Sequence, residues 1–114
     1  MNSFNDFTKI EFRYCDGSGH QGTRSSPIKY KDIELYFRGS RNVMELFRYL
    51  DNTYDFYNGN SIVITGVSAG GMAVYQWSNY LYENTKTAKV YSIPDSGFFI
   101  TNYYSPIAGA KVLS

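Results

Sequence analysis

Ser68 is the residue best placed to do chemistry, because it lies in the stretch GVSAGG (residues 66–71) between a β-branched run and a helix-like pattern. Gly-x-Ser-x-Gly in that context is typical of a nucleophile elbow, a strained turn that projects the serine Oγ above a sheet edge. The first N–H groups of the new helix point toward the oxyanion of an acyl transfer. We therefore predict that Ser68 is a nucleophile and that the Ala69 N–H is an oxyanion donor, with Gly71 allowing close backbone approach.

A phosphate-binding loop is the weaker interpretation of the same glycines. A P-loop ends in Gly-Lys-Ser/Thr and a dinucleotide site uses Gly-x-Gly-x-x-Gly, and residues 66–71 match neither spacing.

A serine needs a base, usually histidine, that a carboxylate orients. The sequence has one histidine, His20, which precedes Ser68, whereas α/β-hydrolases place the carboxylate and then the histidine after the serine. Two explanations stay open. His20 acts in a permuted order with Asp16 or Asp95 as its orienter, or the base lies beyond this chain and His20 is a surface residue of a glycine-flanked loop.

The elements that must position Ser68 follow from hydrophobic periodicity. Apolar runs predict strands at residues 9–14, 32–37, 61–65 and 88–93, the last ending before Pro94. Helical spacing appears over residues 43–50, where Ser40 or Asn42 is the expected N-cap, and over residues 73–84. The alternation of strands and helices predicts an α/β layered sheet.

Composition narrows the possible functions. The chain has 114 residues, a net charge of +1 and scattered charges, so we expect one domain, no nucleic-acid partner and no membrane-binding basic patch. Its single cysteine, Cys15, cannot form an internal disulfide. We find no apolar run of about 18 residues and no signal peptide at the N-terminus. We expect neither a cofactor nor a metal ion.

Four blocks together resemble the pectin acetylesterase and Notum family of serine carboxylesterases, which have the α/β-hydrolase fold. The blocks are RYCDGSGHQG (13–22), YFRGSRN (36–42), TGVSAGGMAV (65–74) and DSGFF (95–99), in the family's order and spacing over residues 9–105. The resemblance implies a three-layer α/β-hydrolase-like sheet with flanking helices, of which residues 1–114 form an incomplete part. It also implies Ser68 as nucleophile, Ala69 as the residue that gives one oxyanion N–H, and secretion from the cell.

Some of the family's residues have no counterpart here. An upstream Gly-Gly-Trp-Cys-like segment, the triad aspartate and histidine, and a cysteine to pair with Cys15 are missing, so we expect an internal piece of a longer enzyme. Asp95 belongs to the DSGFF block but is not assigned to the triad, because the resemblance implies that the triad carboxylate and histidine come much later in the family. A turn-bonding aspartate at a strand end explains Asp95 at least as well.

Two functions follow from the resemblance. The first is a carboxylesterase whose substrate is an O-acetylated polysaccharide or an acylated protein, with this chain inactive by itself. The alternative is a non-catalytic domain that keeps the sheet as a binding or scaffold module. A self-contained hydrolase that uses His20 as its base is the third and weakest hypothesis.

Overall fold

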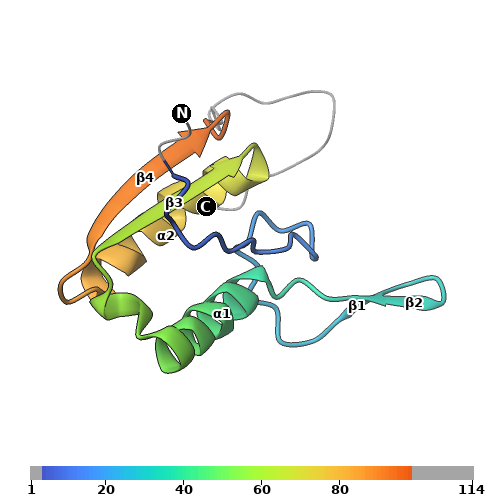
Figure 1. Cartoon of the computed structure of the whole chain (residues 1–114). Coiled ribbons are helices and arrows are strands. Elements are labelled where there is room, and N and C mark those ends of the chain that lie inside the picture. Colours follow the sequence, from blue (N-terminus) through green and yellow to red (C-terminus); the bar gives the residue numbers. More distant parts are fainter. Residues whose placement is uncertain (1–3, 99–114) are drawn as a thin grey trace.

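The computed structural model describes residues 4–98, which contain two α-helices, one short 3-10 helix and two small sheets (Figure 1). In chain order the elements are β1 (Ile28–Tyr30), β2 (Ile33–Leu35), α1 (Gly39–Tyr54), the short 3-10 helix η1 (Phe56–Asn58), β3 (Ser61–Val67), α2 (Ala69–Asn84) and β4 (Lys89–Asp95). β1 and β2 pair as an antiparallel hairpin, and β3 and β4 pair in parallel.

The β3–α2–β4 unit positions Ser68. Parallel strands need a crossover connection, which α2 supplies, and the register runs from Ser61 opposite Lys89 to Val67 opposite Asp95. The β-branched residues of β3 suit a strand, and α2 packs along both strands. Both strands therefore end at the same edge, and Ser68 directly follows β3 at that edge.

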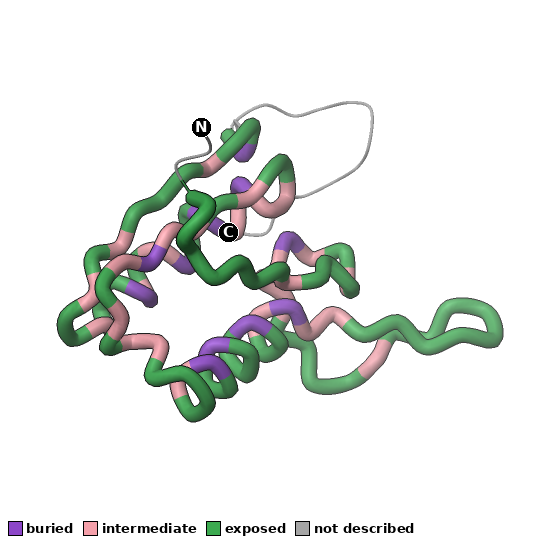
Figure 2. The backbone as a smooth tube through the Cα atoms, in the orientation of Figure 1, coloured by how far each residue is buried: buried purple, intermediate pink, exposed green. Residues whose placement is uncertain are grey.

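The hydrophobic core lies where α1, α2 and β3 meet (Figure 2). On α1 the buried apolar residues are spaced four and three apart, which places them on one face of the helix. The ring of Phe47 is central: its centroid lies 5.9 Å from that of Trp77 and 5.8 Å from that of Tyr80. The buried cluster consists of Val43, Phe47, Leu50, Ile62, Trp77 and Leu81.

The β1–β2 hairpin projects away from this core (Figure 1). All six of its strand residues are exposed. Ile28 pairs with Leu35 and Tyr30 with Ile33, so these four side chains share one face, while Lys29 and Glu34 pair on the other.

The predicted strand at residues 9–14 is wrong. No strand is present there, because no neighbouring strand among residues 4–98 supplies a ladder. Of the alternating side chains, only Phe12 packs against the core, through Phe47, whereas Ile10 and Tyr14 are about half exposed. The hairpin at residues 28–35 takes its place in the element order, and of its two strands the sequence predicted only the second.

Several element boundaries also differ from the prediction. β4 continues through Pro94 to Asp95, since β4 pairs only with β3 among the described residues and a proline is tolerated in an edge strand. α2 begins at Ala69 and α1 at Gly39, each earlier than the apolar periodicity indicates. Neither Ser40 nor Asn42 caps α1, because both lie inside the helix and Arg38 occupies the N-cap position without a side-chain cap hydrogen bond.

The described residues thus form a mixed helix and strand structure, consistent with an incomplete α/β fold. None of their helices is long and apolar enough to cross a bilayer.

Candidate active site

Ser68 lies between the last residue of β3 and the first residue of α2, with φ 56° and ψ −114°. Non-glycine residues seldom have positive φ, and at a bulkier residue than glycine this conformation is strained. Such strain persists only where the surroundings fix the backbone. The turn is therefore held by its packing and hydrogen bonds.

Glycines make that packing possible. A Cβ added to Gly66 would lie 2.5 Å from the carbonyl carbon of Gly70, so the end of β3 and the start of α2 touch through their backbones. A Cβ added to Gly71 would lie 2.6 Å from the Cα of Gly97 and 2.7 Å from the carbonyl oxygen of Asp95. Gly70 differs, because apart from the helix's own backbone a Cβ there would meet nothing within 4 Å.

Two hydrogen bonds fix the backbone of Ser68. Its N–H donates to the carbonyl oxygen of Asp95 at 2.9 Å, which extends the β3–β4 pairing one residue past β3. Its own carbonyl oxygen accepts the N–H of Met72 at 3.0 Å, the first bond of α2. Ser68 is therefore tied to both the neighbouring strand and the helix.

The start of α2 is open. No side chain of residues 4–98 caps it, and the N–H groups of Ala69, Gly70 and Gly71 have no hydrogen-bond acceptor within that range. These unpaired donors, with the positive end of the helix dipole, favour an anion at this position. The Ser68 side chain is exposed and its Oγ makes no hydrogen bond to the described residues.

His20 does not contact Ser68 through a hydrogen bond. Its ring packs against the ring of Tyr14 at 4.9 Å between centroids, and its carbonyl oxygen accepts the indole N–H of Trp77 at 3.2 Å. The imidazole has no hydrogen bond to any carboxylate of residues 4–98. The structure therefore does not bring together the sequence-predicted serine and the one histidine of the chain as a nucleophile and its base.

Asp16 accepts hydrogen bonds at the start of α1. Its carboxylate accepts the N–H of Gly39, the first residue of α1, and the hydroxyl of Ser18 at 2.6 Å. Burial of Asp16 raises its pKa, but these bonds and those from the Ser18 and Arg38 N–H groups favour the charged form, so the pKa lies below its ordinary value of 3.8.

The carboxylates that follow Ser68 are also engaged locally. Asp95 accepts the hydroxyl of Ser96 at 2.8 Å, and Glu83 accepts the side-chain amide of Asn79 at 2.8 Å. Asp95 is brought next to Ser68, but through its main-chain carbonyl oxygen rather than its carboxylate.

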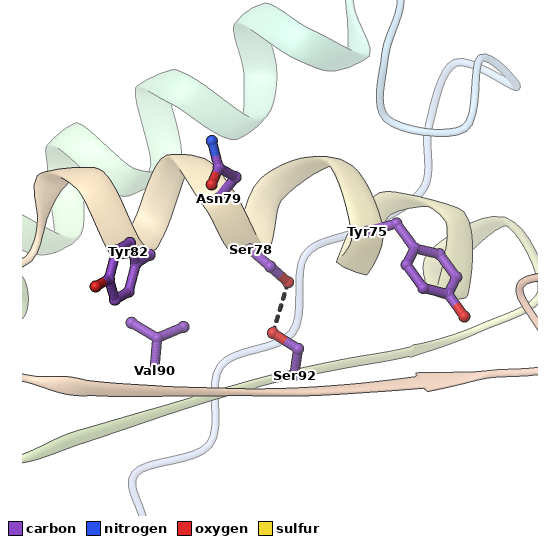
Figure 3. A pocket seen from close by; sticks show the side chains of 6 residues that line it. All are labelled: Tyr75, Ser78, Asn79, Tyr82, Val90 and Ser92. Atoms are coloured by element: carbon purple, nitrogen blue, oxygen red, sulfur yellow. Dashed lines mark hydrogen bonds between the residues drawn. The ribbon is translucent and has the colours of Figure 1, made fainter.

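A shallow groove of about 320 Å³ lies between α2 and β4 (Figure 3). The hydroxyl groups of Ser78 and Ser92 meet across it at 2.6 Å, and Tyr75 and Tyr82 flank it. Ser68 does not line this groove. The groove and the Ser68 turn are therefore separate features of the described residues.

The structural roles of two residues were not predicted from the sequence. Gly97 supports the Ser68 turn, and Asp16 closes the start of α1 from 23 residues away. The DSGFF block is the only sequence signal that points to Gly97; its last residue, 99, lies outside the described residues. Cys15 is exposed, and its thiol donates weakly to the carbonyl oxygen of Arg13 at 3.6 Å.

The family model for pectinacetylesterase matches residues 2–110. The chain belongs to the pectinacetylesterase family. Among curated proteins, it is 31% identical over 105 residues to pectin acetylesterase 11 of Arabidopsis thaliana and 29% identical over 98 residues to pectin acetylesterase 5 of the same plant. Both alignments cover 85% of this chain, but they cover 24% and 22% of the two relatives.

This pectinacetylesterase-family chain thus spans about a quarter of the length of the curated relatives that it matches. No solved structure matches it. The family match includes the whole Ser68 turn and the residues after β4 that support it.

Proposed function

We propose that residues 1–114 are part of an α/β-hydrolase domain of a carboxylic ester hydrolase, and that Ser68 is its nucleophile. The observation that carries this proposal is the conformation of Ser68: a serine with φ 56° between a strand and a helix, at an open helix start. Family membership supports an ester as the substrate. The names of the two relatives favour O-acetyl groups on pectin over an acyl group on a protein.

The chemistry begins when the Ser68 Oγ attacks the carbonyl carbon of the ester. The carbonyl oxygen becomes an oxyanion, which the N–H of Ala69 stabilises together with the dipole of α2. The tetrahedral intermediate collapses to an acyl-enzyme and the alcohol leaves with a proton. Water then attacks the acyl-enzyme, releases the acid and restores the Ser68 hydroxyl.

The general base of this reaction comes from outside these 114 residues. The only histidine, His20, packs against Tyr14, and its imidazole has no bond to Ser68 or to a carboxylate of residues 4–98. A serine without a base is a weak nucleophile. The chain by itself is therefore inactive toward esters. The family resemblance also supports an extracellular location for the whole enzyme.

The test places the chain in the context of a relative. Residues 2–110 replace the matching quarter of Arabidopsis pectin acetylesterase 11, and acetate release from acetylated pectin is measured for this graft and for the free chain. We expect release from the graft, none from the free chain, and loss of about 10³-fold or more in the graft when Ser68→Ala is introduced. Ser78→Ala, which removes a hydroxyl elsewhere on α2, is the matched control and keeps the activity.

Two results contradict the proposal. A well-folded graft without activity favours a non-catalytic binding or scaffold domain. Acetate release by the free chain that disappears on His20→Ala favours a self-contained hydrolase.

A further inference from the structure

We propose that residues 95–97, the last residue of β4 and the bend that follows it, position the nucleophile, and that Gly97 is the residue by which they do so. This inference rests on the proposed role of Ser68. Gly97 does not touch the reacting atoms. It acts through the first turn of α2, which carries the Ala69 N–H.

The contact between this turn and α2 is backbone against backbone. A Cβ added to Gly97 would lie 2.3 Å from the carbonyl carbon of Gly71, 2.5 Å from its Cα and 2.7 Å from the N of Met72. Gly71 and Gly97 are both buried. No flexible side chain lies between them, so any substitution at position 97 must displace the backbone of α2 or of the turn.

The same turn also holds Ser68 itself. Asp95 pairs with Val67 at the end of the sheet, and its carbonyl oxygen accepts the Ser68 N–H at 2.9 Å. The chain then bends at Ser96, which has φ 50°, and Gly97 packs against Gly71. Residues 95–97 therefore contact the elbow at two points: Ser68, directly before α2, and Gly71, the third residue of α2.

Displacement at Gly71 moves the open N–H groups relative to the Ser68 Oγ. An oxyanion donor works at about 2.7–3.1 Å from the oxygen that it stabilises, and a misplacement of about 1 Å can cost about 10²-fold in rate. A Cβ at position 97 requires a movement of that order to reach ordinary contact. Gly97 thus sets the electrostatic environment at position 68 as well as the packing.

The test uses a thiol at position 68 to report that environment in the full 114-residue chain. In Ser68→Cys, the thiolate is itself an anion at the start of α2. Its stability reports the nearby N–H groups without a catalytic base or a bound substrate. Helix N-termini bring thiol pKa values from about 8.5 to about 7.5 or lower. The rate of alkylation by iodoacetamide is followed against pH by peptide mass spectrometry, with the exposed Cys15 as the reference in the same molecule.

We expect Gly97→Ala in the Ser68→Cys background to raise the pH midpoint at position 68 and to slow alkylation there at pH 7 by about three- to tenfold relative to Cys15. Gly59→Ala, which adds the same methyl group away from α2 and 3.4 Å from the carbonyl oxygen of Phe56, leaves the midpoint unchanged. An unchanged midpoint in a folded Gly97→Ala chain overturns the proposal.

If far-UV circular dichroism shows that Gly97→Ala does not fold, hydrogen exchange in the unsubstituted chain decides. The Ser68 N–H, which lies outside any strand or helix, exchanges slowly if the turn holds it. Exchange at the rate of an unprotected amide overturns the proposal. Both readouts are independent of esterase activity, so the two proposals can fail separately. An inactive graft would reject the nucleophile role, whereas a raised alkylation midpoint in Gly97→Ala would still support the positioning of α2 by Gly97.

Discussion

The two helices begin in opposite ways. At the start of α1, the N–H of Gly39 donates to the Asp16 carboxylate, and the N–H of Ser40 donates to the carbonyl oxygen of Gly22. At the start of α2, the N–H groups of residues 69–71 have no acceptor among residues 4–98. Both starts carry the positive end of a helix dipole. Among residues 4–98, a carboxylate closes the start of α1, whereas no acceptor closes the start of α2.

This difference separates a helix start that is closed by a side chain from one where we propose that acyl transfer takes place. The loop that contains Asp16 and His20 closes the start of α1 through the Asp16 carboxylate. The same loop is also bound to α2, because the carbonyl oxygen of His20 accepts the indole N–H of Trp77. The loop before α2 is a single residue, Ser68, which keeps its side chain exposed. Open N–H donors next to an exposed hydroxyl can stabilise the oxyanion of an acyl transfer, for which a base is also needed.

The strongest way to break the comparison is to separate the two helices. Phe47→Ala removes the ring that packs against Trp77 and Tyr80, and truncation of a buried phenylalanine costs about 3–5 kcal/mol. We expect urea denaturation to show loss of a cooperative transition. Tyr49→Ala, on the exposed side of α1, changes the free energy of unfolding by less than about 0.5 kcal/mol. Equal effects of the two substitutions would contradict the placement of the core.

A second prediction concerns the two adjacent glycines of α2. Gly71→Ala forces a Cβ against Gly97 and Asp95, which we expect to lower the free energy of unfolding by about 1–3 kcal/mol. Gly70→Ala meets open space and raises helix propensity, so it should be neutral or stabilise by up to about 1 kcal/mol. Urea denaturation of both variants measures the difference, and a destabilising Gly70→Ala would show that the start of α2 is not open there.

A third prediction concerns the closed start of α1. Asp16→Asn removes the charged acceptor, and loss of a helix cap costs about 0.5–2 kcal/mol. Because the folded-state pKa of Asp16 lies below 3.8, its stabilisation is present above that pH and disappears as the pH falls through the folded-state pKa.

The free energy of unfolding, measured from pH 7 down to pH 2, should therefore fall less steeply for Asp16→Asn than for the unsubstituted chain. Asp32→Asn, in the exposed hairpin, is the control. An identical pH dependence of Asp16→Asn and the unsubstituted chain would mean that the carboxylate does not close α1.

The smallest effect is expected at Ser68. Glycine adopts positive φ without the cost that a side chain imposes, so Ser68→Gly should stabilise the chain by about 0.5–1 kcal/mol while removing the hydroxyl that we propose as the nucleophile. Thermal or urea denaturation measures the gain. A loss of stability would indicate that the Ser68 side chain contributes more to folding than its conformation costs.

Local chemistry made part of this architecture predictable. The GVSAGG stretch indicates a strand–turn–helix junction because a β-branched run ends at its glycines and a helical spacing of apolar residues begins after them. The strand at residues 9–14 was wrongly predicted because alternation describes a side-chain pattern, whereas a strand needs a neighbour to pair with. The contacts of Asp16 with Gly39 and of Gly97 with Gly71 join residues more than 20 positions apart, and no local pattern encodes such contacts.

The central claim is that Ser68 becomes the acylated residue once a base is present. Its most direct test is peptide mass mapping of the pectin acetylesterase 11 graft after treatment with a fluorophosphonate, which bonds covalently to an activated serine. We predict one adduct, on Ser68, that is absent from the Ser68→Ala graft and from the free chain. An adduct that persists in Ser68→Ala, or a folded and unlabelled graft, would contradict the account.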